Sequence, residues 1–248
     1  MDIIPLNVLK KGGGMGRYAR ISYPDLIYHV IKRGNNKEVI FAAEEDYHHY
    51  LNTLQRYKKK FDFKLYAYCL MTNHLHLLIK VGNKGTISRI MQSITVAHTR
   101  YYNYIYRRCG HVWQGRFHSP IVSEDGYMLN VMKYIEQNPL RAGMVKNVAD
   151  YRWSSYLLNV RQKESVLIDR EDNLVFQKLG EDDYSRINAY KKLVNVSLKQ
   201  EDLQEIQVST RKGINYISQK FKEQINALLP NRRKRGRPKK TGELFVSI

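Results

Sequence analysis

Residues 64–81, KLYAYCLMTNHLHLLIKV, decide the fold. Two apolar runs flank Met71-Thr72-Asn73, which is the pattern of a β-hairpin. Side chains alternate between the two faces of a strand, so His74 and His76 point the same way and Leu75 points into the core. Two imidazoles on one face can share a metal ion. The alternative is a pair of polar residues on the solvent face of the sheet.

The segments around this hairpin alternate between helical and strand periodicity. The pattern predicts strands at 27–33 and 116–122, and helices at 44–60, 86–107 and 124–138. Pro139 ends the last helix. The order predicts an α+β fold, in which a small antiparallel-centred sheet carries flanking helices.

Changes in composition divide the rest of the chain. Residues 1–22 form a glycine-containing basic arm, residues 23–160 form the folded domain, and residues 161–230 are polar with helical patches at 182–195 and 216–229. A basic tail follows at 231–248. The arm is interpreted equally well as a phosphate contact or as a frayed terminus.

The net charge of the 248-residue chain indicates what kind of partner it binds. Lys and Arg number 42 against 23 Asp and Glu, a formal net charge of +19. Such a balance favours a polyanionic partner, either nucleic acid or an acidic membrane surface. With only Cys69 and Cys109, the sequence excludes a Cys-rich zinc module and a disulfide scaffold. No apolar run approaches membrane-spanning length, and we expect a cytoplasmic, nucleoid-associated protein with no membrane partner.

The predicted helix at 124–138 presents a second set of reactive groups. Tyr134, Gln137 and Asn138 have helical i, i+3 and i+4 spacing, so they are expected to share one face. A tyrosine can act as a covalent nucleophile, and an amide oxygen can complete a hard-metal site. The alternative for Tyr134 is an ordinary core position on an amphipathic helix.

Five ordered blocks between residues 17 and 156 resemble the single-tyrosine HUH transposases, and more narrowly the REP-associated tyrosine transposases. The blocks are YHVIKRGNNKEVIF at 28–41, YCLMTNHLHLLIK at 68–80, HVWQGRFHS at 111–119, MLNVMKYIEQNPLRAGMV at 128–145 and YRWSSY at 151–156. The resemblance implies the same α+β fold, with residues 23–160 as the catalytic domain.

The resemblance also implies roles for individual residues. His74 and His76 match the metal-binding pair, Tyr134 the nucleophile, and Asn138 the third metal ligand, where related insertion-sequence transposases have Gln. The implied activity is Mg²⁺- or Mn²⁺-dependent cleavage and rejoining of single-stranded DNA through a 5′-phosphotyrosine, on hairpin DNA of the REP type. A homodimer that shares its site between subunits is left open.

Two other functions remain compatible with these residues. One is a nucleic-acid-binding module of the same fold without catalysis, and the other is a metal-dependent nuclease that activates water. A covalent DNA adduct excludes the first, and loss of activity in Tyr134→Phe excludes the second.

Candidate nucleic-acid contacts form two groups. Ahead of the Tyr134 helix lie Arg107, Arg108, Trp113 and Arg116, in which the arginines could hold phosphates and the indole could stack on a base or pack in the core. In the tail, RKRGRPKK resembles an AT-hook with Arg235 and Arg237 in its core. The alternative is a basic tail that binds any polyanion.

Overall fold

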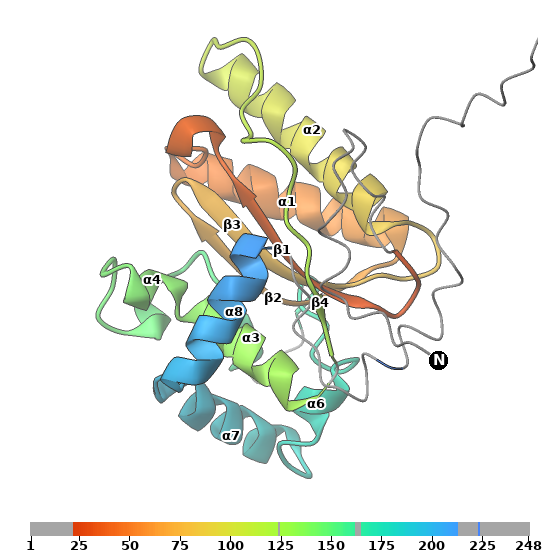
Figure 1. The fold of residues 1–248 in the computed structure, drawn as a ribbon, viewed down its shortest axis with the longest axis vertical. Helices are drawn as coiled ribbons and strands as arrows, with labels where there is room; N and C mark the ends of the chain where they lie inside the picture. Colours follow the sequence, from red (N-terminus) through yellow and green to blue (C-terminus); the bar gives the residue numbers. More distant parts are fainter. Residues whose placement is uncertain (1–21, 124, 162–164, 213–222, 224–248) are drawn as a thin grey trace, which may run out of the picture.

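A four-stranded antiparallel sheet forms the centre of the computed structural model, which describes residues 22–123, 125–161, 165–212 and 223 (Figure 1). The strand order is β2-β3-β1-β4. The strands are β1 (Ile27–Arg33), β2 (Lys64–Met71), β3 (His74–Lys80) and β4 (Ile121–Val122). The predicted hairpin is therefore confirmed as β2 and β3, joined by the tight turn at Thr72 and Asn73.

Helices cover both faces of this sheet. α1 (Glu44–Phe61) and α2 (Ile87–Ile105) lie on one face, and α3 (Gly126–Glu136) lies on the other (Figure 1). Acidic residues begin α1 and lysines end it, which complements the helix dipole. The Thr86 hydroxyl accepts from the Arg89 amide and so caps α2. The predicted α+β architecture is confirmed.

Two elements are shorter than their sequence patterns predicted. The strand expected at 116–122 contains only β4, because residue 118 meets Ile31 of β1 through an isolated bridge and Pro120 has no amide hydrogen to donate. The helix expected at 124–138 ends at Glu136, and α4 (Asn138–Arg141) starts a new direction with Pro139 in its first turn.

Short helices and two longer ones complete the described chain. These are the 3₁₀ turns η2 (Asn35–Lys37) and η3 (Val148–Asp150), and the helices α5 (Tyr156–Asn159), α6 (Leu174–Gln177), α7 (Asp183–Asn195) and α8 (Gln200–Lys212). The helix expected at 182–195 is confirmed as α7. The arm before residue 22, the tail at 231–248 and, except for residue 223, the helix expected at 216–229 lie outside the described residues.

The outer edge of β2 is covered by main chain from later in the sequence. The Leu70 amide donates to the Trp153 carbonyl at 2.9 Å, and the Ser155 amide donates to the Tyr68 carbonyl at 2.9 Å. Further along, the Asp169 amide donates to the Leu65 carbonyl, also at 2.9 Å. This edge therefore has hydrogen-bond partners along much of its length.

One continuous apolar core joins the sheet to the helices on both faces. Leu75 of β3 is fully buried, as its position between the two histidines predicted. Ile187 and Tyr190 of α7 and Ile206 of α8 belong to the same cluster. The region after residue 165 therefore packs as part of this core. Among the helices in the described residues, none is long and apolar enough to cross a membrane.

Candidate functional site

Three histidines gather on the face of the sheet that α3 covers. His74 and His76 project from β3, where they pair with Arg33 and Ile31 of β1. His29 of β1 lies two residues before Ile31 and therefore on the same face. Its Nε2 lies 2.9 Å from Nδ1 of His76, at hydrogen-bonding distance. His76 is only 4% exposed, so the solvent-face alternative does not describe it.

Hydrogen bonds to Nδ1 orient the predicted ligand pair. Nδ1 of His74 lies 2.7 Å from Oδ1 of Asn73, which can only accept, so His74 donates through Nδ1. This tautomer leaves Nε2 of His74 with a free lone pair. If His76 likewise donates from Nδ1 to Nε2 of His29, its own Nε2 also keeps a free lone pair. Partners of this kind, on the ring nitrogen that does not bind the metal, typically orient metal-ligating histidines.

All three imidazoles are neutral at physiological pH. Burial lowers the pKa of His29 to about 3. Burial, followed by the charge of Arg33, lowers the pKa of His74 to about 4. Burial and the neighbouring histidines and arginines hold the pKa of His76 well below its usual value. Neutral imidazole is the form that binds a metal.

Tyr134 lies over this cluster from α3. Its ring centroid is 5.8 Å from that of His76 and 5.9 Å from that of His29, and both contacts are edge-to-face. The side chain is 8% exposed. The structure therefore brings together the tyrosine and the histidine pair, which are nearly sixty residues apart in the sequence.

Asn138 lies directly after the end of α3. Its Nδ2 donates to the carbonyl oxygens of Tyr134 at 3.1 Å and Ile135 at 3.3 Å. Pro139 cannot donate a backbone hydrogen bond to Ile135, so the Asn138 side chain supplies the missing donor. With its nitrogen used in this way, Oδ1 is the amide atom left to coordinate a metal.

Gln137 does not share the Tyr134 face, contrary to the helical spacing, because α3 ends before it. Its Nε2 donates to the carbonyls of Val194 at 2.6 Å and Val196 at 2.9 Å, at the end of α7. Lys133 also turns away from the tyrosine, with Nζ donating to the Ser197 carbonyl at 3.3 Å. The last turn of α3 is thus anchored to the C-terminal region.

A buried carboxyl forms another anchor. Oε1 of Glu136 accepts from Ser155 Oγ at 2.6 Å and Asn159 Nδ2 at 2.8 Å, and Oε2 accepts from the Tyr190 hydroxyl at 2.8 Å. Burial raises the pKa of Glu136 to about 7, although these hydrogen bonds oppose the rise. The group ties α3 to both the segment beside β2 and α7.

Arg141 folds back from α4 onto the tyrosine. Its Cζ lies 4.2 Å from the centroid of the Tyr134 ring, and Nη2 donates to the Tyr134 carbonyl. Nη1 lies 3.5 Å from Oε1 of Gln137. A guanidinium stacked on an aromatic face is a favourable cation–π contact.

α8 packs across α3 (Figure 1), and residues near its C-terminal end act on the Tyr134 hydroxyl. Thr210 hydrogen-bonds this hydroxyl through its side chain, and Arg211 lies within electrostatic range. Burial raises the pKa of Tyr134, while Arg141, Arg211 and the Thr210 hydrogen bond act in the opposite direction. The net rise in pKa means that Tyr134 is a neutral phenol at physiological pH.

The predicted metal ligands fit a divalent ion by their donor chemistry. His74 and His76 supply ring nitrogens, and Asn138 supplies an amide oxygen. In the described part of the chain, no group of three or more His, Cys, Asp and Glu side chains could hold a metal ion. The candidate site is thus a mixed nitrogen and oxygen set, which suits Mn²⁺ better than Mg²⁺ because Mn²⁺ tolerates imidazole more readily.

The candidate nucleic-acid contacts in the described part of the chain lie in the segment that follows α2. Trp113 is buried, and its indole donates to the Thr95 carbonyl of α2 at 3.1 Å, which fits its core-packing interpretation. Arg108 pairs with Glu38 at 2.8 Å, and Arg107 and Arg116 are exposed. Arg235 and Arg237 lie outside the described residues.

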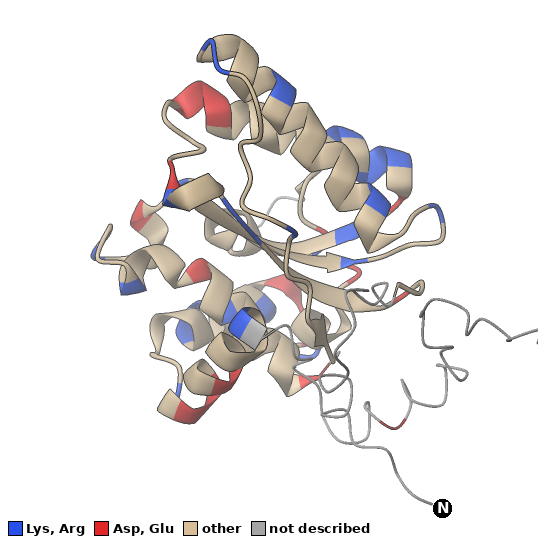
Figure 2. Ribbon diagram, turned by 45° about the horizontal axis from the view of Figure 1, so that its top comes forward, with Lys and Arg blue, Asp and Glu red and all other residues tan. Residues whose placement is uncertain are grey.

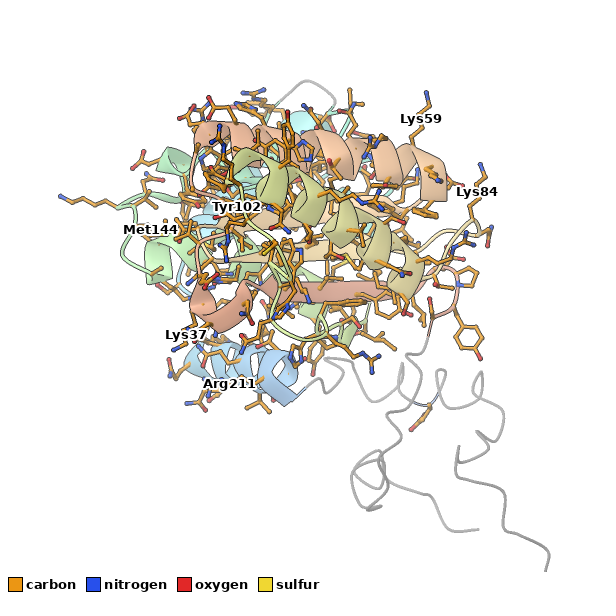
Figure 3. The ribbon with its side chains drawn as sticks, turned by 90° about the horizontal axis from the view of Figure 1, so that it is seen from above. Lys37, Lys59, Lys84, Tyr102, Met144 and Arg211 are labelled. Atoms are coloured by element: carbon orange, nitrogen blue, oxygen red, sulfur yellow. The ribbon has the colours of Figure 1, made fainter. Side chains whose placement is uncertain are left out.

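Basic side chains occur on both helical layers, so charge alone does not define one interface (Figure 2). Lys59 and Lys84 project at the end of the molecule away from Arg211 (Figure 3). The cations around Tyr134 are therefore separate from those at the far end of the α1–α2 layer.

Four residues of the site were not predicted from the sequence. His29 lies in a recognised strand, but its closeness to His76 depends on the β1–β3 register. Arg141 lies seven residues after Tyr134, a helical spacing that would have placed it on the same face. Thr210 and Arg211 are distant in sequence and no local pattern indicates them.

Comparison with known proteins agrees with the motif resemblance. Residues 22–138 match the family model described as "Transposase IS200 like". A Haemophilus influenzae protein named as a REP-associated tyrosine transposase is 25% identical over 113 residues, which cover 41% of this chain and 63% of that protein. The chain thus spans less than two thirds of the curated relative's length.

The fold also matches a solved structure, that of a REP-associated tyrosine transposase bound to a REP hairpin. The TM-score is 0.51 at 18% sequence identity, and the match covers 62% of this chain and 92% of that chain. The predicted fold and the motif resemblance are both confirmed.

Proposed function

Since residues 22–138 match the IS200-like transposases, we propose that the chain cleaves and rejoins single-stranded DNA through a covalent bond to Tyr134. The observation that supports this most strongly is the position of Tyr134, whose ring lies 5.8 Å from that of His76 on the histidine-bearing face of the sheet. A tyrosine can act as a covalent nucleophile, and this one lies beside two neutral imidazoles oriented to bind a metal ion.

The reaction exchanges one phosphodiester for another. The Tyr134 oxygen bonds to the phosphorus, and the bond to the 3′ oxygen of the upstream nucleotide breaks. The phenol proton leaves for solvent, and the departing 3′ oxygen takes up a proton. Because the phosphodiester energy is kept, a second 3′ hydroxyl can reverse the step and join new strands.

His74, His76 and Asn138 would hold a divalent metal, which when bound supplies a Lewis acid that polarises the scissile phosphate. Asn73 and His29 keep the two imidazoles oriented through Nδ1. Burial of Tyr134 keeps bulk water away from the phosphotyrosine, which favours rejoining over hydrolysis.

The proposed substrate is an imperfect hairpin with single-stranded flanks. A tyrosine held at the end of a rigid helix must meet the phosphate in line, and a flexible strand reaches that geometry more readily than a stacked duplex. The relative whose solved structure has the same fold is bound to a REP hairpin, which is consistent with this choice. We expect cutting in the flank and little cutting of a fully paired duplex.

The test uses the full chain with Mn²⁺ and a pool of labelled hairpin oligonucleotides whose flanks are randomised, so that many target sequences are sampled at once. Wild-type protein should give a labelled protein–DNA adduct on a denaturing gel, and Tyr134→Phe should give none. EDTA should abolish the adduct. Tyr184→Phe, at an exposed tyrosine of α7, serves as the matched control and should keep activity.

The other outcomes identify the alternatives. Cleavage that persists in Tyr134→Phe and releases a free 5′ phosphate would indicate a nuclease that uses water. Binding of the hairpins without cleavage under any metal would indicate a non-catalytic module. Either result would refute the proposed function.

A further inference from the structure

Arg141 is placed to act on the nucleophile itself. It lies seven residues beyond Tyr134, and the break at Gln137 turns α4 so that the guanidinium returns to the tyrosine. Cζ lies 4.2 Å from the ring centroid. A side chain on the surface of a short helix has many other rotamers, so this position indicates a specific contact.

Its hydrogen bonds leave much of the guanidinium available. Nη2 donates to the Tyr134 carbonyl, and Nη1 is 3.5 Å from Oε1 of Gln137. A guanidinium has five N–H donors arranged in a planar fork that matches the oxygens of a phosphate. The side chain remains partly exposed to solvent, so these donors can be reached by a ligand.

The charge of Arg141 reaches the centre of the site. Its guanidinium stacks on the Tyr134 ring, and the centroid of that ring lies 5.8 Å from the centroid of the His76 ring. The described residues contain no acidic side chain paired with Arg141 at salt-bridge distance. An arginine that lacks an acidic partner beside a nucleophile is suited to an anionic substrate.

We propose that Arg141 holds the Tyr134 ring for in-line attack and binds the scissile phosphodiester next to the Tyr134 oxygen. The inference rests on the proposed function and adds a residue to it. In the ground state, the guanidinium fixes the ring by stacking. As negative charge builds on the phosphate oxygens during the attack, the same group stabilises it, and this contribution is larger in the transition state than in the bound substrate.

The alternative is a purely structural role, in which Arg141 caps the carbonyl end of α3. Such a role predicts a lower unfolding temperature wherever the donor to the Tyr134 carbonyl is lost, and a saturating rate of adduct formation that does not depend on the charge of the side chain. Arg141→Lys and Arg141→Met make that comparison, because both retain a long aliphatic stem that can pack on the ring.

A matched control exists on the other side of the sheet. Arg152 also stacks on an aromatic ring, with Cζ 4.5 Å from the Trp153 centroid, and it pairs with Glu44 of α1 at 2.7 Å. Arg152→Met removes the same charge and the same type of contact away from Tyr134.

The experiment measures the single-turnover rate of adduct formation against DNA concentration for each variant, together with the unfolding temperature. We expect the saturating rate to fall about 100-fold in Arg141→Met and about tenfold in Arg141→Lys, in line with the loss of one transition-state donor. The half-saturating DNA concentration should change less than about threefold. Arg152→Met should match wild type in both parameters.

Equal saturating rates for the lysine and methionine variants, or a loss in Arg141→Met no larger than in Arg152→Met, would overturn the inference while leaving the proposed function intact. If the Arg141 variants raise only the half-saturating DNA concentration and keep the saturating rate, Arg141 is an ordinary binding contact, and this result would also overturn the inference. If wild-type protein forms no adduct with any hairpin of the pool, the proposed function fails first, and the inference fails with it.

Discussion

Glu136 makes the stability of the protein depend on pH in an unusual direction. The pKa of this carboxyl rises from 4.5 to about 7 in the folded state, chiefly through burial. The folded protein therefore keeps a proton on Glu136 that the unfolded chain has lost between these two values. By linkage, the contribution of Glu136 to stability is fully present below pH 4.5 and is lost as the pH rises to 7.

The size of the effect follows from the shift. One pKa unit corresponds to about 1.4 kcal/mol, so the shift amounts to about 3 kcal/mol of unfolding free energy. Its titratable neighbours do not cancel it, because burial raises the pKa values of Tyr68, Cys69 and Tyr190 and keeps them neutral throughout this range. Glu136→Gln should remove the effect, since an amide oxygen can still accept from Ser155 and Asn159.

The assay is equilibrium unfolding in urea at pH 5, 6, 7 and 8 for wild type and variant. Near pH 5 the two should differ by less than about 1 kcal/mol, and by pH 8 the variant should be more stable by about 3 kcal/mol. Glu44→Gln is the control, because Glu44 is an exposed partner of Arg152 and should give no such trend. If the difference in unfolding free energy between Glu136→Gln and wild type stays constant from pH 5 to 8, the claim that Glu136 is a buried carboxyl with a raised pKa is refuted.

Three further predictions follow from the site and the tail. His29→Phe should weaken Mn²⁺ binding about tenfold, measured by calorimetry, because Nδ1 of His76 loses its orienting partner; unchanged affinity would contradict this. His74→Ala should lose adduct formation at little cost in unfolding temperature, whereas His76→Ala should lose both activity and stability because His76 is buried; adduct formation by either variant would contradict the metal assignment. Truncation after Pro230 removes seven cations together with Glu243 and lowers the net charge from +19 to +13. If about five of these contact phosphates, the salt slope of duplex binding should fall by about four to five while single-strand adduct formation survives, and an unchanged slope would exclude the tail as a DNA contact.

Local sequence patterns predicted the elements that depend on local chemistry. The hairpin at 64–81 follows from its apolar runs and its turn, and the helix over 44–60 follows from periodicity and end charges. The end of α3 was predicted two residues late, because Pro139 acts on the preceding turn and Asn138 replaces the backbone donors there. Local sequence therefore predicts that these helices and strands exist more reliably than it predicts the residues at which they end.

The parts of the site that were missed depend on contacts between distant segments. The spacing of His74 and His76 predicted a shared face, but only the pairing of β1 with β3 brings His29 beside them. Gln137 was assigned to the tyrosine face by helical spacing, yet the carbonyls at the end of α7 hold it elsewhere. Thr210 reaches the tyrosine only because α8 packs on α3. Nonlocal packing of this kind leaves no periodic trace in the sequence.

The main chain that runs along β2 has a consequence for how copies of this protein can meet. An open strand edge is a template on which another chain can add a strand, and this route leads both to shared-sheet dimers and to aggregates. Here the carbonyl of Trp153 and the amides of Ser155 and Asp169 already satisfy the outward groups of β2. At the opposite end of the sheet, β4 contributes only two residues and follows Pro120. Two subunits that associate will therefore do so more readily through side chains on their helices than by extending one sheet into the next. A strand from a partly unfolded copy likewise finds few free backbone groups on the sheet edges of a folded one.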